Sequence, residues 1–177
     1  MLFNKSILVS SLILALASAA TTSAAATPKP AAVTGQTGTI IDDKNFCIFL
    51  PPKAGGGIAE NEDKAVAFCT VPLSGAPKAG ILPTGFIQSA HLVKTSNYIQ
   101  VTGRIDRSKY SLSKNDGGGQ YDMKAPVGAK CAGYNYFVEL VEPDIQVYCI
   151  RCCKNKADCP VNKSTYGCQK VLGGSYA

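Results

Sequence analysis

The chain has no tryptophan, only one histidine and only two methionines among its 177 residues. One histidine, His91, leaves little from which to build a histidine-based metal site or proton relay. Without tryptophan, a platform for stacking sugar rings would have to come from tyrosine or phenylalanine. The charged fraction is an ordinary 17% and the formal net charge is +6, which is typical of a globular domain and unlike a disordered tail.

One apolar run is present, at the N-terminus, and it is shorter than the roughly 20 residues that a membrane-spanning helix needs. Lys5 precedes the mostly apolar residues 7–17, which end in the small-residue triplet Ala17-Ser18-Ala19. This order predicts a secretory signal peptide over residues 1–19, cleaved after Ala19 or Ala20. We therefore expect a secreted, extracellular protein with no stable insertion in a membrane.

Eight cysteines, an even number, follow the predicted cleavage site. In a secreted chain they predict up to four disulfides, with a zinc site as the alternative. The sequence does not fix their full pairing. A bridge between Cys47 and Cys69 is suggested, because each lies in an apolar strand-like segment and the two segments could be neighbours, and the adjacent Cys152 and Cys153 should have different partners. The full set is Cys47, Cys69, Cys131, Cys149, Cys152, Cys153, Cys159 and Cys168.

Residues 20–38 consist mainly of alanine, threonine, serine, proline and glycine, which predicts a flexible linker with candidate O-glycosylation sites. The remaining residues 39–177 are enough for one hydrophobic core, so we expect a single disulfide-rich β domain. Asn162-Lys163-Ser164 is an N-glycosylation sequon, which places Asn162 at the surface. A glycan there would cover part of the cysteine-rich region and favours a binding surface elsewhere.

Hydrophobic periodicity within the domain is that of strands. Tyr98, Gln100, Thr102 and Arg104 alternate with apolar or small residues, which predicts a strand over 98–105 with one face inward and one face in water. Further short strands are predicted over 46–50, 65–71, 86–93, 134–141 and 145–150, separated by glycine- and proline-rich turns. The predicted fold is mainly β, a small antiparallel sandwich or barrel stapled by disulfides, with a cysteine-rich C-terminal extension.

Three segments together carry a resemblance: residues 85–91, residues 98–103 and the GGGQYD run of 117–122, followed by the cysteine cluster from Cys149 to Cys168. This combination resembles a family of small secreted cysteine-rich fungal proteins without an established biochemical activity. The resemblance extends over nearly all of the predicted domain. It implies an extracellular, effector-like fungal protein and supplies no catalytic residues.

A glycine-rich segment is the candidate binding loop. It could present backbone N–H groups to an anion, but it lacks the Lys and Ser/Thr of a nucleotide-binding P-loop, and a hairpin connection is the simpler interpretation. A calcium site using two of its carboxylates is conceivable, although the spacing matches no EF-hand. The segment comprises Asn115, Asp116, Gly117, Gly118, Gly119, Gln120, Tyr121 and Asp122.

Basic residues are grouped shortly before this segment, and such a surface attracts acidic polysaccharides, lipid head groups or acidic proteins. A solubilising surface is the competing interpretation. The basic residues are Arg104, Arg107, Lys109 and Lys114.

No catalytic motif is present. His91 lies in a strand-like segment without a G-x-S-x-G elbow, which favours an ordinary side chain on a sheet face. The acidic residues Glu139, Glu142 and Asp144 surround Pro143 in what looks like a solvated loop. We therefore expect no enzyme activity, no catalytic residues, no metal and no cofactor.

The function that the sequence favours is extracellular binding of a glycan or a protein, at the fungal surface or in a host's extracellular space, with no nucleic-acid partner. A structural protein associated with the cell wall is the alternative. A small hydrolase or a protease inhibitor is the enzyme-related alternative.

Overall fold

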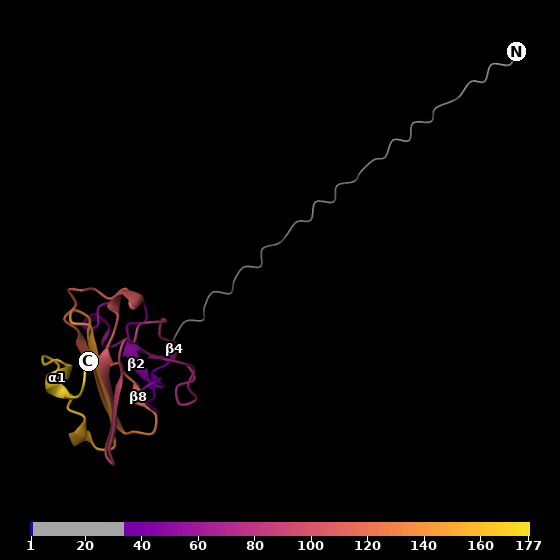
Figure 1. Cartoon of the computed structure of the whole chain (residues 1–177). Helices are drawn as coiled ribbons and strands as arrows, with labels where there is room; N and C mark the ends of the chain where they lie inside the picture. The colour runs from indigo at the N-terminus through magenta and orange to yellow at the C-terminus, as the bar shows by residue number, and fades with distance from the viewer. Residues whose placement is uncertain (2–33) are drawn as a thin grey trace. The chain divides into compact units, whose positions relative to one another are not determined.

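The computed structural model describes Met1 and residues 34–177. The predicted signal peptide and most of the predicted linker, residues 2–33, lie outside the described residues. The described chain is mainly β, and its strands are arranged in three sheets (Figure 1). The strands are β1 (Thr37–Gly38), β2 (Cys47–Leu50), β3 (Val66–Cys69), β4 (Gly80–Ile81), β5 (His91–Lys94), β6 (Tyr98–Arg104), β7 (Gly119–Asp122), β8 (Lys130–Cys131), β9 (Tyr136–Glu142) and β10 (Val147–Cys153). The short helices are η1 (Ala59–Asn61), η2 (Arg107–Tyr110), η3 (Lys156–Asp158) and α1 (Cys168–Val171).

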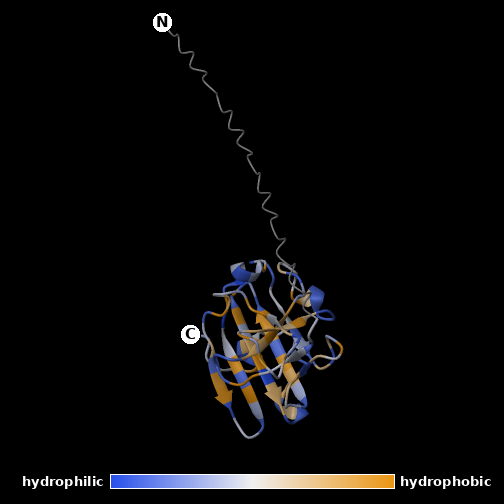
Figure 2. Ribbon diagram, turned by 90° about the vertical axis from the view of Figure 1, so that its right-hand side faces the viewer, coloured by the Kyte–Doolittle hydropathy of each residue, from blue (hydrophilic) through white to orange (hydrophobic). Residues whose placement is uncertain are grey.

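The largest sheet has five antiparallel strands in the order β5-β6-β10-β9-β7. Its long central strands are rich in β-branched and aromatic residues, which suit a pleated, packed surface. Hydrophobic and hydrophilic residues alternate along the strands (Figure 2). This alternation gives the sheet two distinct faces, because successive side chains point to opposite sides.

The inner face packs against a three-stranded sheet of order β2-β3-β4. Phe49 of β2 stacks on Phe137 of β9 with ring centroids 4.9 Å apart, and Phe46 stacks on Tyr148 of β10 at 5.9 Å. These rings are buried in one large hydrophobic cluster that joins the two sheets. The predicted antiparallel β fold is confirmed in its sandwich-like form, and no closed barrel is formed among the described residues.

The outer face is covered by the C-terminal segment, residues 154–177, which is attached by two disulfides, Cys149–Cys168 and Cys153–Cys159. Valine, leucine and cysteine side chains of β9 and β10 form a second hydrophobic cluster with α1. The sequence-based expectation that one face of β6 meets water is wrong here. Gln100 and Thr102 are only 2% and 0% exposed, because the C-terminal segment lies over them.

These buried polar side chains all have partners. Arg151, also on the outer face, donates from Nε to Gln100 Oε1 at 2.7 Å and from its Nη atoms to the carbonyls of Asp158 and Leu172 at 2.9 and 3.0 Å. Its guanidinium lies 4.2 Å from the centre of the Tyr98 ring. Thr102 donates to the Ser175 carbonyl at 2.7 Å. Arg151 therefore joins the sheet to two separate parts of the C-terminal segment.

The predicted bridge between Cys47 and Cys69 is confirmed, and the two residues face each other directly in the β2–β3 register. The adjacent cysteines have different partners, as predicted: Cys152 pairs with Cys131 and Cys153 with Cys159. All eight cysteines are in disulfides, so no thiolate is left for the zinc alternative.

The predicted strand over 86–93 is wrong in its first part, since β5 begins only at His91. The amides of Gln88 and Ser89 both donate to the Arg104 carbonyl, at 2.9 and 3.3 Å, so two residues oppose one and the ladder is interrupted. Gly103 allows this approach, because a Cβ atom there would collide with the Ser89 carbonyl.

The ordered domain includes residues that the sequence assigned to the linker. Thr37 and Gly38 form β1, which pairs in parallel with β8, and the Gly35 carbonyl accepts from the Ala67 amide at 2.7 Å. Small residues with few apolar atoms carry no signal for this pairing, which depends on backbone hydrogen bonds to distant strands.

Candidate binding groove

A groove of about 420 Å³ lies where two glycine-rich loops meet. One loop follows β2 and contributes Gly55, Gly56, Gly57, Ile58, Ala59 and Glu60, and the other precedes β7 and contributes Ser113, Asn115, Asp116 and Gly117. The groove thus includes part of the predicted binding loop.

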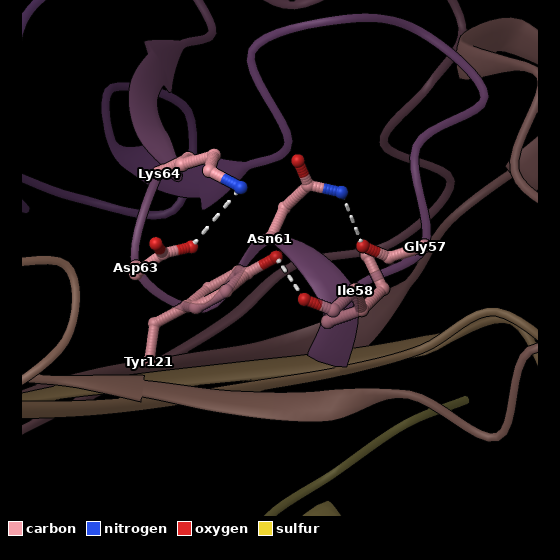
Figure 3. Close-up of polar contacts among 6 residues, drawn as sticks. All are labelled: Gly57, Ile58, Asn61, Asp63, Lys64 and Tyr121. Atoms are coloured by element: carbon pink, nitrogen blue, oxygen red, sulfur yellow. Dashed lines mark hydrogen bonds and ion pairs between the residues drawn. The ribbon is translucent and has the colours of Figure 1, made fainter.

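The first wall is held from below and from the side (Figure 3). Tyr121 rises from β7 and donates its hydroxyl to the Ile58 carbonyl at 3.0 Å, and Asn61 donates to the Gly57 carbonyl at 2.8 Å. Burial raises the pKa of Tyr121, so this hydroxyl stays a hydrogen-bond donor. Lys64 and Asp63, further along, form an exposed ion pair at 3.7 Å that contributes little to stability.

Asp116 joins the second wall to the first. One carboxylate oxygen accepts from the Ile58 amide at 2.9 Å and the other from the Gly118 amide at 2.9 Å. The Asp116 carbonyl accepts a hydrogen bond from the Asp144 backbone amide at 3.0 Å, which anchors the loop to the β9–β10 turn. Hydrogen bonds from Tyr121 and Asn61 therefore fix the first wall, and those of Asp116 fix the second.

The rest of the predicted loop is a strand. Gly119, Gln120, Tyr121 and Asp122 form β7, paired with β9, so the hairpin-connection interpretation applies only to residues 115–118. Gly118 adopts φ +91°, and a Cβ atom there would collide with the Val141 carbonyl. Glycine is needed at this position for both reasons. The run of glycines predicted a turn, and for this reason the strand that begins at Gly119 was not predicted from the sequence.

The two aspartates considered for calcium have separate structural partners. Asp122 accepts from the Lys124 amide at 2.7 Å and from Gln120 Nε2 at 2.8 Å, whereas Asp116 bonds the groove walls. Among the described residues, no group of three or more His, Cys, Asp and Glu side chains is placed to hold a metal ion.

The exposed lining of the groove is polar. Glu60, Ser113 and Asn115 are exposed, and around Gly117 a Cβ atom would meet no other atom within 4 Å. The amide nitrogens of Gly57 and Gly117 have no protein acceptor within residues 34–177. The groove thus offers a carboxylate, an amide, a hydroxyl and free backbone groups, which is the chemistry that recognises hydroxyl-rich or peptide ligands.

The predicted basic residues lie at the same end of the five-stranded sheet as the groove. Arg104 ends β6 opposite Val147, next to the β9–β10 turn that holds Asp116, and Arg107 donates to the Pro143 carbonyl in that turn at 3.4 Å. Lys109 belongs to η2, and Lys114 is an exposed residue of the second wall's loop. The structure therefore brings the predicted basic residues and the predicted loop into one region.

His91 lies on the outer face of the sheet, where its Nε2 is 3.0 Å from the Ala177 carbonyl. The nearby Ser89 hydroxyl makes no hydrogen bond with His91; its Oγ accepts a hydrogen bond from the Arg104 amide at 3.0 Å. Asn162 is exposed, in a loop between η3 and α1. Its glycosylation stays a prediction.

Glu139 was placed by the sequence in a solvated loop, and this is wrong. It is 0% exposed in the middle of β9, on the inner face, and its two carboxyl oxygens each lie 2.9 Å from the Phe49 amide nitrogen in β2. Burial raises the pKa of Glu139 well above its usual value, with a smaller opposing effect from the Phe49 hydrogen bond. Glu142 is half-buried and its pKa is also raised by burial. Alternation along the strand would have placed Glu139 with Phe137 and Val141, and this was the available signal.

Sequence reasoning also missed the first wall. The Gly55-Gly56-Gly57 run was interpreted only as a turn between strands, and nothing local indicates that it faces residues 113–117. The signal that does exist is the occurrence of two three-glycine runs in one short domain.

The fold and groove define a small, disulfide-stapled β protein with a polar surface groove. Comparison with known proteins adds a fungal context. The chain is 37% identical over 98 residues to Appressorium protein ROW1 and 31% identical over 88 residues to Appressorium protein ROW2, both from Mycosarcoma maydis. The matches cover 55% and 49% of this chain but only 22% and 29% of those relatives, so the chain spans less than a third of either.

The resemblance to fungal proteins is supported by these two relatives. No protein-family model matches the chain, and no solved structure matches it. In the part of the chain that the structure describes, no helix has the length and apolar character needed to cross a membrane.

Proposed function

We propose that this protein is a secreted, non-catalytic interaction protein that acts at the fungal surface or in a host's extracellular space and binds an extracellular glycan or protein. The observation that carries the proposal is the polar groove between residues 55–60 and 113–117, whose walls are fixed by Asp116 and Tyr121. Fixed walls favour binding, because little conformational entropy is lost when a ligand enters.

Two further observations support this role. The four disulfides fit a protein that works in an oxidising, extracellular environment. Both relatives are named appressorium proteins of a fungus, which fits an effector-like or cell-surface setting.

The groove chemistry supports binding over hydrolysis. A glycosidase needs two carboxylates placed about 5 to 10 Å apart on either side of the bond it cleaves. Of the two carboxylates in the groove lining, Asp116 has both oxygens occupied by backbone amides, which leaves Glu60 alone. His91 is in β5, which belongs to neither groove wall.

The test is binding of the secreted full-length protein to arrays of extracellular glycans and fungal or host surface proteins, followed by titration of each hit. Gly117→Trp places a large side chain in open space beside the groove, without backbone strain, and should weaken binding about tenfold or more. Ser96→Trp is the matched control, because Ser96 is exposed in the turn between β5 and β6, at the opposite end of the sheet.

Saturable binding that Gly117→Trp weakens and Ser96→Trp leaves unchanged supports the proposal. If no ligand binds across broad arrays, or if both variants bind as the original protein does, the groove is not the binding site. Turnover of a bound substrate would contradict the non-catalytic assignment.

A further inference from the structure

A second hollow, of about 260 Å³, lies at the other end of β7 from the groove, near Asp122 and the start of β9. We refer to it as the lysine-rimmed pocket. Its lining is mostly apolar and includes the half-buried ring of Tyr136, whereas the Phe137 ring is fully buried on the inner face of the sheet. It consists of Asp122, Met123, Lys124, Tyr136, Phe137, Lys156, Cys159 and Val161.

The pocket continues into a neighbouring hollow of about 400 Å³. Both are lined by Lys124, Lys156, Cys159 and Val161, and the second also reaches Asn162. The two hollows therefore share a wall, with the Tyr136 ring at one end and Asn162 at the other.

The charge of the rim is positive. Lys124 and Lys156 are exposed, and neither forms an ion pair within 4 Å in residues 34–177, where the one such pair is Lys64–Asp63. The nearby Asp122 carboxylate is buried and already accepts from the Lys124 amide and from Gln120 Nε2. The two lysines outnumber the one carboxylate of the lining, so the rim attracts an anion.

We infer that the lysine-rimmed pocket binds a small aryl carboxylate. The ring packs against Tyr136, Met123 and Val161, and the carboxylate lies between the ammonium groups of Lys124 and Lys156. An apolar cavity of about 150 Å³ holds a benzene molecule, so the present volume accommodates a ring together with a short acidic substituent. The Tyr136 ring favours an aryl group over a flexible alkyl chain, because ring pairs add to the energy of apolar burial. This inference is independent of the function proposed for the groove.

The experiment is a titration of the ¹⁵N-labelled protein with three probes, followed by two-dimensional NMR. Cinnamate supplies the ring and the charge, cinnamyl alcohol keeps the skeleton without the charge, and decanoate keeps the charge without the ring. Cinnamate should bind with a Kd of about 1 mM or tighter, given its size, and shift the amides of residues 122–124, 136–137 and 156–161. The alcohol and decanoate should each bind at least several-fold more weakly.

Paired variants locate the charge requirement. Lys124→Gln with Lys156→Gln should raise the Kd for cinnamate about tenfold, because each partly desolvated ion pair contributes a factor of about two to five. Lys154→Gln is the control, since Lys154 is an exposed lysine of the same segment that does not line the pocket. Its Kd should stay within about twofold of the original.

Four outcomes would overturn the inference: no saturable binding at about ten times the expected Kd, equal binding of the alcohol, tighter binding of decanoate, or an unchanged Kd in the double lysine variant. Shifts confined to residues 55–60 and 113–117 would also overturn it, because the ligand would then occupy the groove. Failure of this test leaves the array result for the groove unaffected, so the two proposals are judged separately.

Discussion

The two faces of the five-stranded sheet are stabilised in different ways. The inner face is packed by large aromatic rings against a second sheet, as in the Phe49–Phe137 stack. The outer face is covered by a segment with little regular structure, held by Cys149–Cys168, Cys153–Cys159 and the contacts of Arg151. A short irregular segment buries too little apolar surface to order itself, so covalent links and charged hydrogen bonds add to the small hydrophobic cluster on this face.

Two ionisable groups, one on each face, differ in their hydrogen-bond partners. Arg151 on the outer face donates to three acceptors and stacks on Tyr98. Glu139 on the inner face has one backbone amide as its hydrogen-bond partner and is fully buried, which favours its neutral form. The outer group can therefore remain charged, whereas the inner group makes stability depend on pH.

Complete reduction should have the largest effect on both faces. The bridges close loops with sequence separations of 22, 21, 19 and 6 residues, and each contributes typically about 2 to 4 kcal/mol. Together they are comparable to the whole stability of a typical domain, about 5 to 15 kcal/mol. We expect the reduced protein to unfold near body temperature in a thermal melt followed by circular dichroism. An unchanged melting temperature after alkylation of all eight thiols would contradict this.

Single substitutions should separate the two faces. Phe137→Ala removes a fully buried ring from the inner core and should lower the free energy of unfolding by about 3 to 5 kcal/mol. Arg151→Gln should cost less, about 1 to 3 kcal/mol, and should speed hydrogen exchange mainly in residues 168–177. Urea unfolding and hydrogen exchange measure the two effects. Arg104→Gln, at an exposed position, is the control and should change stability by less than about 0.5 kcal/mol.

A reversed order, with Arg151→Gln costing more than Phe137→Ala, would show that the outer layer carries more of the stability than the aromatic core. Equal exchange rates throughout both variants would show that the two faces unfold as one unit. Either result would contradict the proposed difference in how the inner and outer faces are stabilised.

Glu139→Gln should change the free energy of unfolding least of these variants, and only above acidic pH. The folded state holds its proton to higher pH than the unfolded state, because burial raises the pKa of Glu139. The free energy of unfolding of the original protein should therefore fall as pH rises from about 4.5 toward the raised pKa. Glu139→Gln should match the original protein near pH 5 and be the more stable of the two at higher pH.

Urea unfolding from about pH 5 to about pH 9 measures this dependence. Glu142 adds a dependence of the same sign, since burial raises its pKa as well, so the variant should be flatter with pH than the original protein but still slope slightly. Glu62→Gln, at an exposed position, is the control and should retain the original slope. Identical slopes for Glu139→Gln and the original protein would contradict the assignment.

The sequence by itself determined the mainly antiparallel β fold and the strand that begins at Tyr98, and it suggested the Cys47–Cys69 bridge. These depend on local signals: alternation with a period of two, β-branched and aromatic runs, and cysteines on segments that can pair. The candidate site was predicted only in part, because residues 115–117 form one wall of the groove and the other wall lies some 55 residues earlier in the chain.

Only the tertiary structure decided what covers each face of the sheet. The alternation in β6 correctly indicated two faces, but the C-terminal segment buries Gln100 and Thr102, which the sequence assigned to water. The same holds for Glu139, whose position beside Phe49 depends on how two sheets pack. A side chain's periodicity is fixed by its own strand, whereas its burial is fixed by segments distant in the chain, and that is the physical reason why the two kinds of prediction differed in success.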